Sequence, residues 1–194
     1  KNQNHKLMPR RQLSRPKIQN MMCVHYLDEH VLEGQSPNHP PTVAIVSQEG
    51  FSKYLSFTII KHSITLKSLT EFVTTLKIQF PRMNVIICDR DPVHKSRAFQ
   101  QFCDKLHIRI GFSLARNPSQ NRIERTFLDL VSQMRIQKST FPKSSLEDLF
   151  FKAVQVHNST PHILSYSSAE GQSKRAFLSP HQVLYGSVPN NGED

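Results

Sequence analysis

Residues 85–124 read VIICDRDPVHKSRAFQQFCDKLHIRIGFSLARNPSQNRIE, and this stretch decides the fold. It begins with an apolar run of strand length, 85–88, which places Asp89 at a strand end. It finishes with the turn-rich segment 117–121, after which Glu124 lies near the start of a helical pattern. Two carboxylates are therefore placed where a strand tip and a helix start could meet. Whether a third carboxylate joins them decides the function.

The composition is that of one globular domain with an anionic partner. The chain has 194 residues, and its 25 Lys and Arg against 15 Asp and Glu give a net charge of +10. Such a surplus favours nucleic acid as the partner. No apolar run is long enough to cross a membrane. We expect a basic leader or linker at 1–17, which has no apolar centre and is no secretory signal, one core domain at 18–189, and a tail at 190–194.

The cysteines and histidines indicate neither a disulfide framework nor a zinc site. The cysteines, Cys23, Cys88 and Cys103, are scattered and odd in number, which is typical of reduced thiols in an intracellular protein. The ten histidines show no paired spacing with cysteines.

The order of hydrophobic patterns predicts a mixed sheet with helices on its faces. Strands are expected at 21–27, 42–46, 53–60, 84–88 and 108–112, with the second and third forming a hairpin around the turn at 48–50. Helices are expected from Ser63 to Pro81, over 96–106, from about Ser119, from Ser144 with a capping box to Glu147, and over 179–185. A polar loop is expected at 165–174. The strand at 84–88 is apolar on both faces, which is typical of a central strand covered by helices.

Several segments, in their order along the chain, resemble the catalytic core of retroviral and long-terminal-repeat retrotransposon integrases, which are relatives of DDE transposases. They are Phe51-Ser52-Lys53-Tyr54 on the expected second strand, Cys88-Asp89, FQQFC at 99–103, NPSQNRIER at 117–125, HNSTPH at 157–162 and SPHQVLYG at 179–186. The resemblance implies a ribonuclease-H-like α/β fold with a five-stranded mixed sheet and helices on both faces.

The resemblance also implies a chemistry. In this family three carboxylates hold two divalent ions, usually Mg²⁺, for an in-line displacement at phosphorus, and Mn²⁺ is the other expected cofactor. Mg²⁺ prefers hard oxygen ligands, so carboxylates suit it. By resemblance Asp89 is the second carboxylate and Glu124 the third.

The first carboxylate is the open question. The family pattern expects it on the first strand, in a context resembling Trp-x-x-Asp or His-x-Asp. One alignment puts His25 in that place and another puts Leu27 there. Asp28 is the nearby acidic candidate, but we expect it to need a one-residue bulge or shift to point inward, because a slip of one residue turns a side chain to the other face. A neutral His25 imidazole would be a softer ligand than a carboxylate.

Other departures concern the turn after Asp89 and the glycine position near Glu124. The family usually has Asn-Gly after the second Asp, whereas this chain has Arg90-Asp91-Pro92, and Arg90 would bring a positive charge to Asp89. Arg122 stands where a glycine is usual. Our hypothesis is an integrase-derived core that binds nucleic acid or protein partners and has lost or weakened its strand-transfer activity. The alternative is an active polynucleotidyl transferase, for DNA integration or 3′-processing, that uses Asp28, Asp89 and Glu124.

The predicted partners follow from charge and resemblance. Six cations are candidates for nucleic-acid contacts: Arg116, Arg122, Arg125, Lys138, Lys95 and Arg97. Contacts of Arg and Lys with phosphates would give salt-dependent affinity with little sequence choice. By resemblance we expect a homodimer through the helices at 63–80 and 146–157. We expect a nuclear location and no membrane association.

Overall fold

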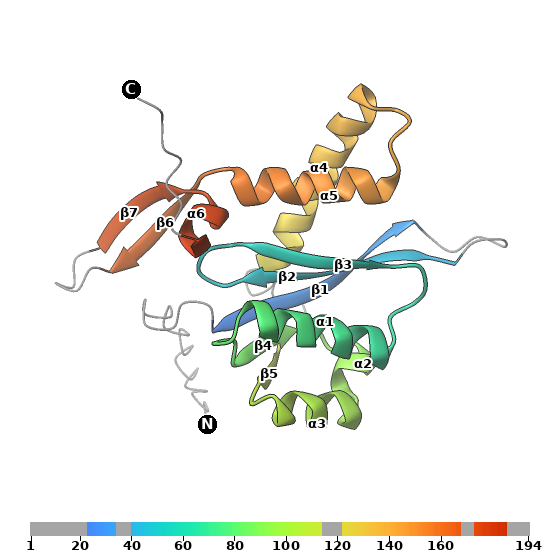
Figure 1. Cartoon of the computed structure of the whole chain (residues 1–194), viewed down its shortest axis with the longest axis vertical. Helices are drawn as coiled ribbons and strands as arrows, with labels where there is room; N and C mark the ends of the chain where they lie inside the picture. Colours follow the sequence, from blue (N-terminus) through green and yellow to red (C-terminus); the bar gives the residue numbers. More distant parts are fainter. Residues whose placement is uncertain (1–22, 34–39, 114–121, 168–172, 186–194) are drawn as a thin grey trace, which may run out of the picture.

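The computed structural model describes residues 23–33, 40–113, 122–167 and 173–185. The predicted leader, the predicted tail and Arg116 lie outside the described residues. A five-stranded sheet has the order β3-β2-β1-β4-β5 (Figure 1). Its strands are β1 (Val24–Glu33), β2 (Thr42–Glu49), β3 (Leu55–Ile60), β4 (Val85–Cys88) and β5 (Arg109–Phe112). The β1–β2 and β2–β3 pairs are antiparallel, while β1–β4 and β4–β5 are parallel, so the predicted mixed α/β sheet is confirmed.

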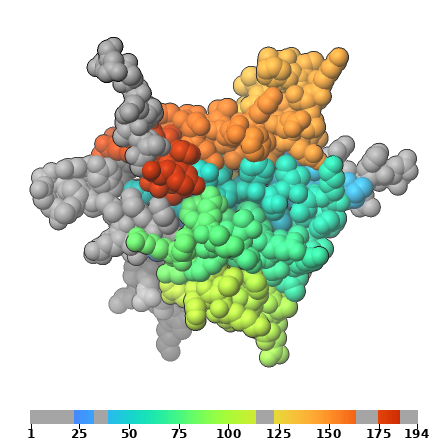
Figure 2. Space-filling view, in the orientation of Figure 1, coloured from blue at the N-terminus to red at the C-terminus, as the bar shows by residue number. Residues whose placement is uncertain are grey.

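Helices cover both faces of this sheet. The helices α1 (Leu66–Gln79) and α3 (Arg97–Lys105) lie on one face, and α4 (Arg122–Thr140) and α5 (Leu146–Ser159) lie on the other (Figures 1 and 2). The short α2 (Pro92–Lys95) follows β4, and α6 (Pro180–Tyr185) packs against α5. Within the described ranges, no helix combines the length and the apolar character needed to span a bilayer.

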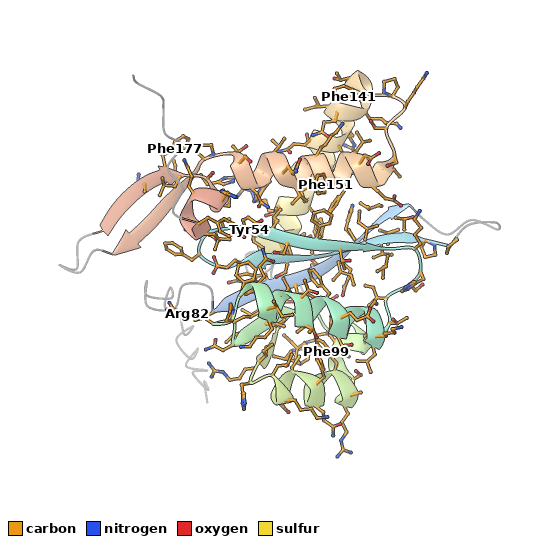
Figure 3. All side chains as sticks on the ribbon, viewed as in Figure 1. Tyr54, Arg82, Phe99, Phe141, Phe151 and Phe177 are labelled. Atoms are coloured by element: carbon orange, nitrogen blue, oxygen red, sulfur yellow. The ribbon has the colours of Figure 1, made fainter. Side chains whose placement is uncertain are left out.

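Each of the two helical layers packs on one face of the sheet and forms a separate hydrophobic core with it. The first cluster includes Leu27, Ile45 and Phe99, and it lies between the sheet and α1 and α3 (Figure 3). The second cluster includes Val46 and Phe127, and it lies between the sheet and α4 and α5. Neighbouring residues of β2 therefore serve opposite cores, and all eight of its residues are buried. A fully buried side chain of this kind contributes roughly 1.5–3 kcal/mol.

The helix starts differ from the sequence expectation by one or two residues. Thr65 rather than Ser63 caps α1, because Thr65 accepts the N–H of Ser68 and the Ser68 hydroxyl accepts the N–H of Thr65. Ser145 rather than Ser144 caps α5, since its hydroxyl accepts the N–H of Asp148. The helix expected over 96–106 is α3, and Ser96 is its N-cap. Several hydroxyl residues stand side by side at these starts, so pattern alone does not select among them.

Two strand predictions are corrected. The first strand is longer than the expected 21–27 and continues through Asp28 to Glu33, because its polar half pairs with β2 over its whole length. The expected polar loop at 165–174 overlaps a hairpin, β6 (His162–Ser167) with β7 (Ser173–Leu178). This hairpin extends beyond the sheet and carries Phe177 (Figure 3).

The segment 51–54 is a turn rather than part of a strand. The Glu49 carboxylate accepts hydrogen bonds from the N–H groups of Phe51 and Ser52, which closes the connection between β2 and β3. At the other end of the connection, Asn158 on α5 binds the first residue of β3. Its Oδ1 accepts the N–H of Leu55 at 2.8 Å and its Nδ2 donates to the Leu55 carbonyl at 2.9 Å. The 157–162 motif thus joins α5 to the edge of the sheet.

Candidate functional site

Alternation along β1 sends neighbouring side chains to opposite cores. Leu27 is part of the first cluster, on the α1 and α3 side. Tyr26 packs against the second cluster, and the His30 ring stacks on Phe127 of α4 at 4.9 Å between centroids. Asp28 lies between Tyr26 and His30 in the same alternation, so it belongs to the α4 side of the sheet.

His25 lies in the opposite core. Its side chain is 1% exposed, its Nδ1 is 2.9 Å from the Ser47 hydroxyl, and its ring centroid is 4.6 Å from that of Phe80. Burial lowers the pKa of His25 to about 3, so the imidazole is neutral at ordinary pH. The structure therefore places His25 among core side chains, away from the sheet end, rather than in the position expected for the first carboxylate.

Asp28 reaches the sheet end without the bulge that the sequence led us to expect. The β1–β2 ladder is regular from His25 to Val31, and its irregularity comes only after Val31. In the parallel ladder of β1 and β4, Tyr26 pairs with Ile87. Asp28 lies two residues after Tyr26 on β1, and Asp89 lies two residues after Ile87, directly beyond the end of β4, so the same register continued would bring them to one level. Asp89 and Asp28 are both among the charges that, after burial, raise the pKa of Cys88, which ends β4.

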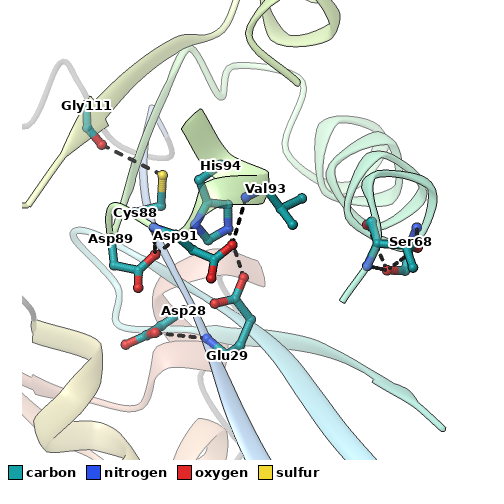
Figure 4. A network of polar contacts seen from close by, with 10 residues as sticks. Asp28, Glu29, Ser68, Cys88, Asp89, Asp91, Val93, His94 and Gly111 are labelled. Carbon is teal, nitrogen blue, oxygen red and sulfur yellow. Dashed lines mark hydrogen bonds and ion pairs between the residues drawn. The ribbon is translucent and has the colours of Figure 1, made fainter. Parts of the chain in front are cut away.

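The residues after Asp89 form a helix start that returns a side chain to it. Asp91 caps α2 by accepting the N–H of Val93 at 2.8 Å, and Pro92 occupies the first turn. One turn of helix brings the buried His94 back to Asp89, with 2.8 Å between Nδ1 and the carboxylate Oδ1 (Figure 4). The same Oδ1 accepts the N–H of Asp91 at 3.0 Å.

The other His94 nitrogen faces Glu29 of β1, with 2.8 Å between Nε2 and Oε1. Burial alone would lower the pKa of His94, but the hydrogen bonds and charges of Glu29 and Asp89 outweigh it and raise the pKa to about 9. The ring is thus an imidazolium between two carboxylates. Arg90, expected to bring a positive charge to Asp89, is exposed and forms no ion pair with it in the part of the chain that the structure describes. The cation beside Asp89 is His94.

Glu124 lies in the first turn of α4 and is exposed. The following turn anchors this helix on the sheet, because Thr126 accepts a hydrogen bond from Gln48 at 3.0 Å and Phe127 stacks on His30. Gln48 pairs with Tyr26, two residues before Asp28 on β1, and His30 lies two residues after Asp28. The contacts of α4 with Gln48 and with His30 therefore lie on either side of Asp28 along the strand. Glu124 therefore starts the helix that covers the face on which Asp28 lies.

The predicted nucleic-acid cations do not form one group. Arg125 and Lys138 are exposed on α4, whereas Lys95 and Arg97 are exposed at α2 and α3, on the other face of the sheet. The Lys138 ammonium also donates to the Ser144 carbonyl at 2.9 Å. The side chain of Arg122, like Arg116, lies outside the described residues.

The three predicted carboxylates have the donor chemistry of a site for a hard divalent cation, but the group of ligand atoms that the described residues bring within 4.8 Å of one another joins Asp89 to Glu29 and His94 and includes neither Asp28 nor Glu124. Asp28, Asp89 and Glu124 offer only carboxylate oxygens, the class that Mg²⁺ prefers. The Asp89 side chain is 46% exposed, and the hydrogen bonds that the described residues make to it are accepted by Oδ1 rather than by Oδ2. Asp28 uses one oxygen to accept the N–H of Glu29 at 2.9 Å.

Sequence reasoning missed Glu29 and His94. The ligand atoms of Glu29, Asp89 and His94 all lie within 4.8 Å of one another. A signal was present for both residues. For His94, the pair Asp91-Pro92 predicts a helix start just after Asp89. For Glu29, the alternation along the strand places its side chain on the same core-facing side as Leu27, where a carboxylate requires a cationic partner.

Comparison with solved structures identifies the fold. The chain superposes on a chain from the structure of the simian T-cell lymphotropic virus intasome in complex with the PP2A regulatory subunit B56 gamma, with a TM-score of 0.68 and 20% identity. That match covers 99% of this chain and 63% of the viral one. The HTLV-2 integrase catalytic core in complex with magnesium gives a TM-score of 0.61 at 16% identity, over 85% of this chain and 97% of that one. The BIV integrase catalytic core gives 0.59 at 18% identity, over 84% and 93%.

The sequence itself matches no protein-family model and no curated protein. The structural likeness nevertheless extends over nearly the whole of two separate catalytic cores, and it includes the five-stranded mixed sheet with helices on both faces. The chain therefore has the ribonuclease-H-like fold of retroviral integrase catalytic cores.

Proposed function

We propose that this chain is an integrase-type core that carries out metal-dependent phosphodiester chemistry on DNA, with Asp28, Asp89 and Glu124 as its metal-binding carboxylates. One observation carries the proposal. The parallel ladder of β1 and β4 pairs Tyr26 with Ile87, and continuing this register by two residues brings Asp28 to the level of Asp89, which directly follows β4. Since neighbouring strands lie about 4.8 Å apart, two carboxylates at one level can share a cation.

The residues of this chain would divide the work as follows. A divalent ion, when bound, supplies charge stabilisation at the reacting phosphate and activates the attacking oxygen. Asp28 and Asp89 would hold it from two strands of a rigid sheet, and Glu124 would close the site from the start of α4. Carboxylates fixed on strands and a helix keep their geometry better than carboxylates on loops.

The comparisons support DNA as the substrate and a homodimer as the assembly. One similar protein is part of a viral intasome, and an HTLV-2 core was solved with magnesium in a dimeric form. We extend both properties to this chain, together with its net charge of +10, which favours an anionic substrate. The dimer would use α1 and α5, whose exposed apolar side chains include Ile78 and Phe151. A protein that acts on chromosomal DNA would work in the nucleus.

A second candidate function is a core that binds DNA but has weakened chemistry. The observation in its favour is the imidazolium of His94, which lies against Asp89 and would oppose a cation there. Glu29 on the other side of the ring offsets this charge, because the group of His94, Glu29 and Asp89 carries a net charge of −1 when His94 is protonated. For that reason we place metal-dependent chemistry first.

A cleavage and strand-transfer assay on duplex oligonucleotides in Mg²⁺ or Mn²⁺ tests the proposal. Asp28→Asn, Asp89→Asn and Glu124→Gln should each lower the rate at least about a hundredfold, because charge stabilisation by a metal is worth several kcal/mol and each ~1.4 kcal/mol is a factor of ten. Two exposed carboxylates serve as matched controls, Asp104→Asn on α3 and Asp129→Asn on the same helix as Glu124, and both should retain the rate.

The outcomes separate the two candidates. Metal-dependent cleavage that is lost in the three site variants and kept in the controls supports catalysis. DNA binding without any cleavage in the unmodified protein leaves the binding function alone. Cleavage that survives Asp28→Asn would contradict the role of the first strand.

A further inference from the structure

The side chains of Glu29 and His94 form a pair that the proposed chemistry does not use directly. Both lie on the α1 and α3 side of the sheet, away from Asp28. His94 is fully buried and its ring lies 5.9 Å from that of Phe99 in the first cluster, while the Glu29 side chain is 13% exposed. Their ion pair, with 2.8 Å between Nε2 and Oε1, is therefore buried at the edge of an apolar core.

A buried pair of this kind does little for stability. Removing two charges from water costs several kcal/mol per ion, and well-packed apolar residues of similar volume often serve as well or better. The first cluster already supplies apolar neighbours at this point, including Phe99 and Val93. Packing alone therefore does not explain why a carboxylate and a histidine occupy these positions. The contact of His94 with Asp89 does explain it.

That contact fixes one oxygen of Asp89. Oδ1 lies 2.8 Å from the His94 Nδ1 and accepts the N–H of Asp91 at 3.0 Å. Turning of the His94 ring is opposed by α2, which fixes its backbone, and by the 2.8 Å ion pair of its Nε2 with Glu29, a close contact that lacks hydrogen-bond geometry. With Oδ1 held by two donors, the carboxylate keeps one orientation, and Oδ2 is the oxygen left for a ligand (Figure 4).

We propose that His94, held in place by Glu29, is a positioning residue that retains Oδ1 of Asp89 and so presents Oδ2 as a single metal-binding oxygen. This inference rests on the proposed function, since it takes Asp89 to be a metal ligand. Partners of metal ligands typically contribute tenfold to a hundredfold in metal affinity through such orientation.

Mn²⁺ binding to the whole chain, followed by titration calorimetry and by the EPR signal of free Mn²⁺, tests the inference. His94→Asn keeps an N–H donor near the position of Nδ1 but no longer reaches Glu29, whereas His94→Leu has a similar volume and no donor. Glu29→Gln keeps its shape and removes the charge that holds the ring. His107→Asn is the matched control, because His107 is exposed with a φ of 56°, a conformation that Asn accepts.

We expect His94→Leu to weaken Mn²⁺ binding about tenfold or more. His94→Asn should recover most of this loss, Glu29→Gln should give an intermediate loss, and His107→Asn should change nothing. Charge alone predicts the reverse, since removing the imidazolium from beside Asp89 would tighten the binding of a cation in both His94 variants. Circular dichroism of each variant identifies any that fails to fold, and Glu29→Gln then carries the test.

Failure of the inference and failure of the proposed function can be told apart. If His94→Leu and His94→Asn bind Mn²⁺ alike, or both bind it more tightly, the positioning role is overturned while the chemistry of Asp89 stands. If Asp89→Asn binds Mn²⁺ as tightly as the unmodified protein does, Asp89 is no ligand, and both proposals fall together.

Discussion

Replacing His25 by glutamine should remove a large part of the acid sensitivity of this fold. His25 is buried beside Ser47 and Phe80, and its burial lowers its pKa from 6.5 to about 3. The unfolded chain takes up a proton on this imidazole below pH 6.5, whereas the folded chain does so only below about pH 3. Between these values the unfolded state binds more protons, so the free energy of unfolding falls as the pH falls.

The size of the effect follows from the two pKa values. Between pH 7 and pH 5 the linkage relation gives a loss of about 2 kcal/mol from this single side chain. Glutamine is not protonated in this range, so the variant takes up no proton at this position in either the folded or the unfolded state. The comparison of the unmodified protein with His25→Gln cancels the contributions of all other titrating groups that the two proteins share.

Urea unfolding followed by circular dichroism at pH 7 and pH 5 measures the quantity. We expect the unmodified protein to lose about 2 kcal/mol more than His25→Gln over this interval. Equal losses in the two proteins would refute the reasoning, because they would mean that His25 is protonated as easily in the folded chain as in the unfolded one.

Three further predictions concern other parts of the molecule. Asn158→Ala leaves the buried N–H and C=O of Leu55 without their partner, so we expect urea unfolding to show a loss of about 2–4 kcal/mol, and a loss below 1 kcal/mol would argue against this clamp. The pKa of His94 is raised from 6.5 to about 9, so the stabilisation by its protonated form is fully present below pH 6.5 and is lost as the pH rises through 9. Between these pH values the melting temperature of the unmodified protein should therefore fall more steeply than that of His94→Asn. Parallel curves for the two proteins would contradict this prediction. Fluorescence anisotropy should show DNA affinity falling by a large factor between about 50 and 200 mM salt, and Arg125→Ala should reduce the slope of this dependence by about one; an unchanged slope would remove Arg125 from the interface.

Much of the fold could be predicted because its signals are local and strong. The apolar run of β4 and the helical spacing of α1 and α4 each depend on neighbouring residues in the chain. The second and third strands were recognised as a hairpin for the same reason. Such patterns decide which residues are buried, and burial provides most of the stability of the elements.

The errors in the sequence predictions arose where the structure depends on contacts between residues that are far apart in the chain. The end of β1 is polar, and its pairing with β2 extends it past Asp28. The position of His25 also depends on this register, since a histidine can serve either as a ligand or as a neutral core residue, and its neighbours choose between these roles. The β6–β7 hairpin offered the sequence no apolar alternation strong enough to outweigh its polar residues. His94 reaches Glu29 through a fold contact that no spacing along the chain reveals.

The clamp of Asn158 on Leu55 has a consequence for how this protein behaves in a crowded solution. β3 is an outer strand of the sheet, and an outer strand exposes backbone groups that can recruit a strand from another molecule. The amide of Asn158 offers Leu55 the same donor and acceptor that an incoming strand would offer. The first residue of the edge is thereby already paired, and α5 stands over it. The Asn158 side chain, which joins α5 to the sheet, thus also blocks the addition of a strand from another molecule at that end of β3.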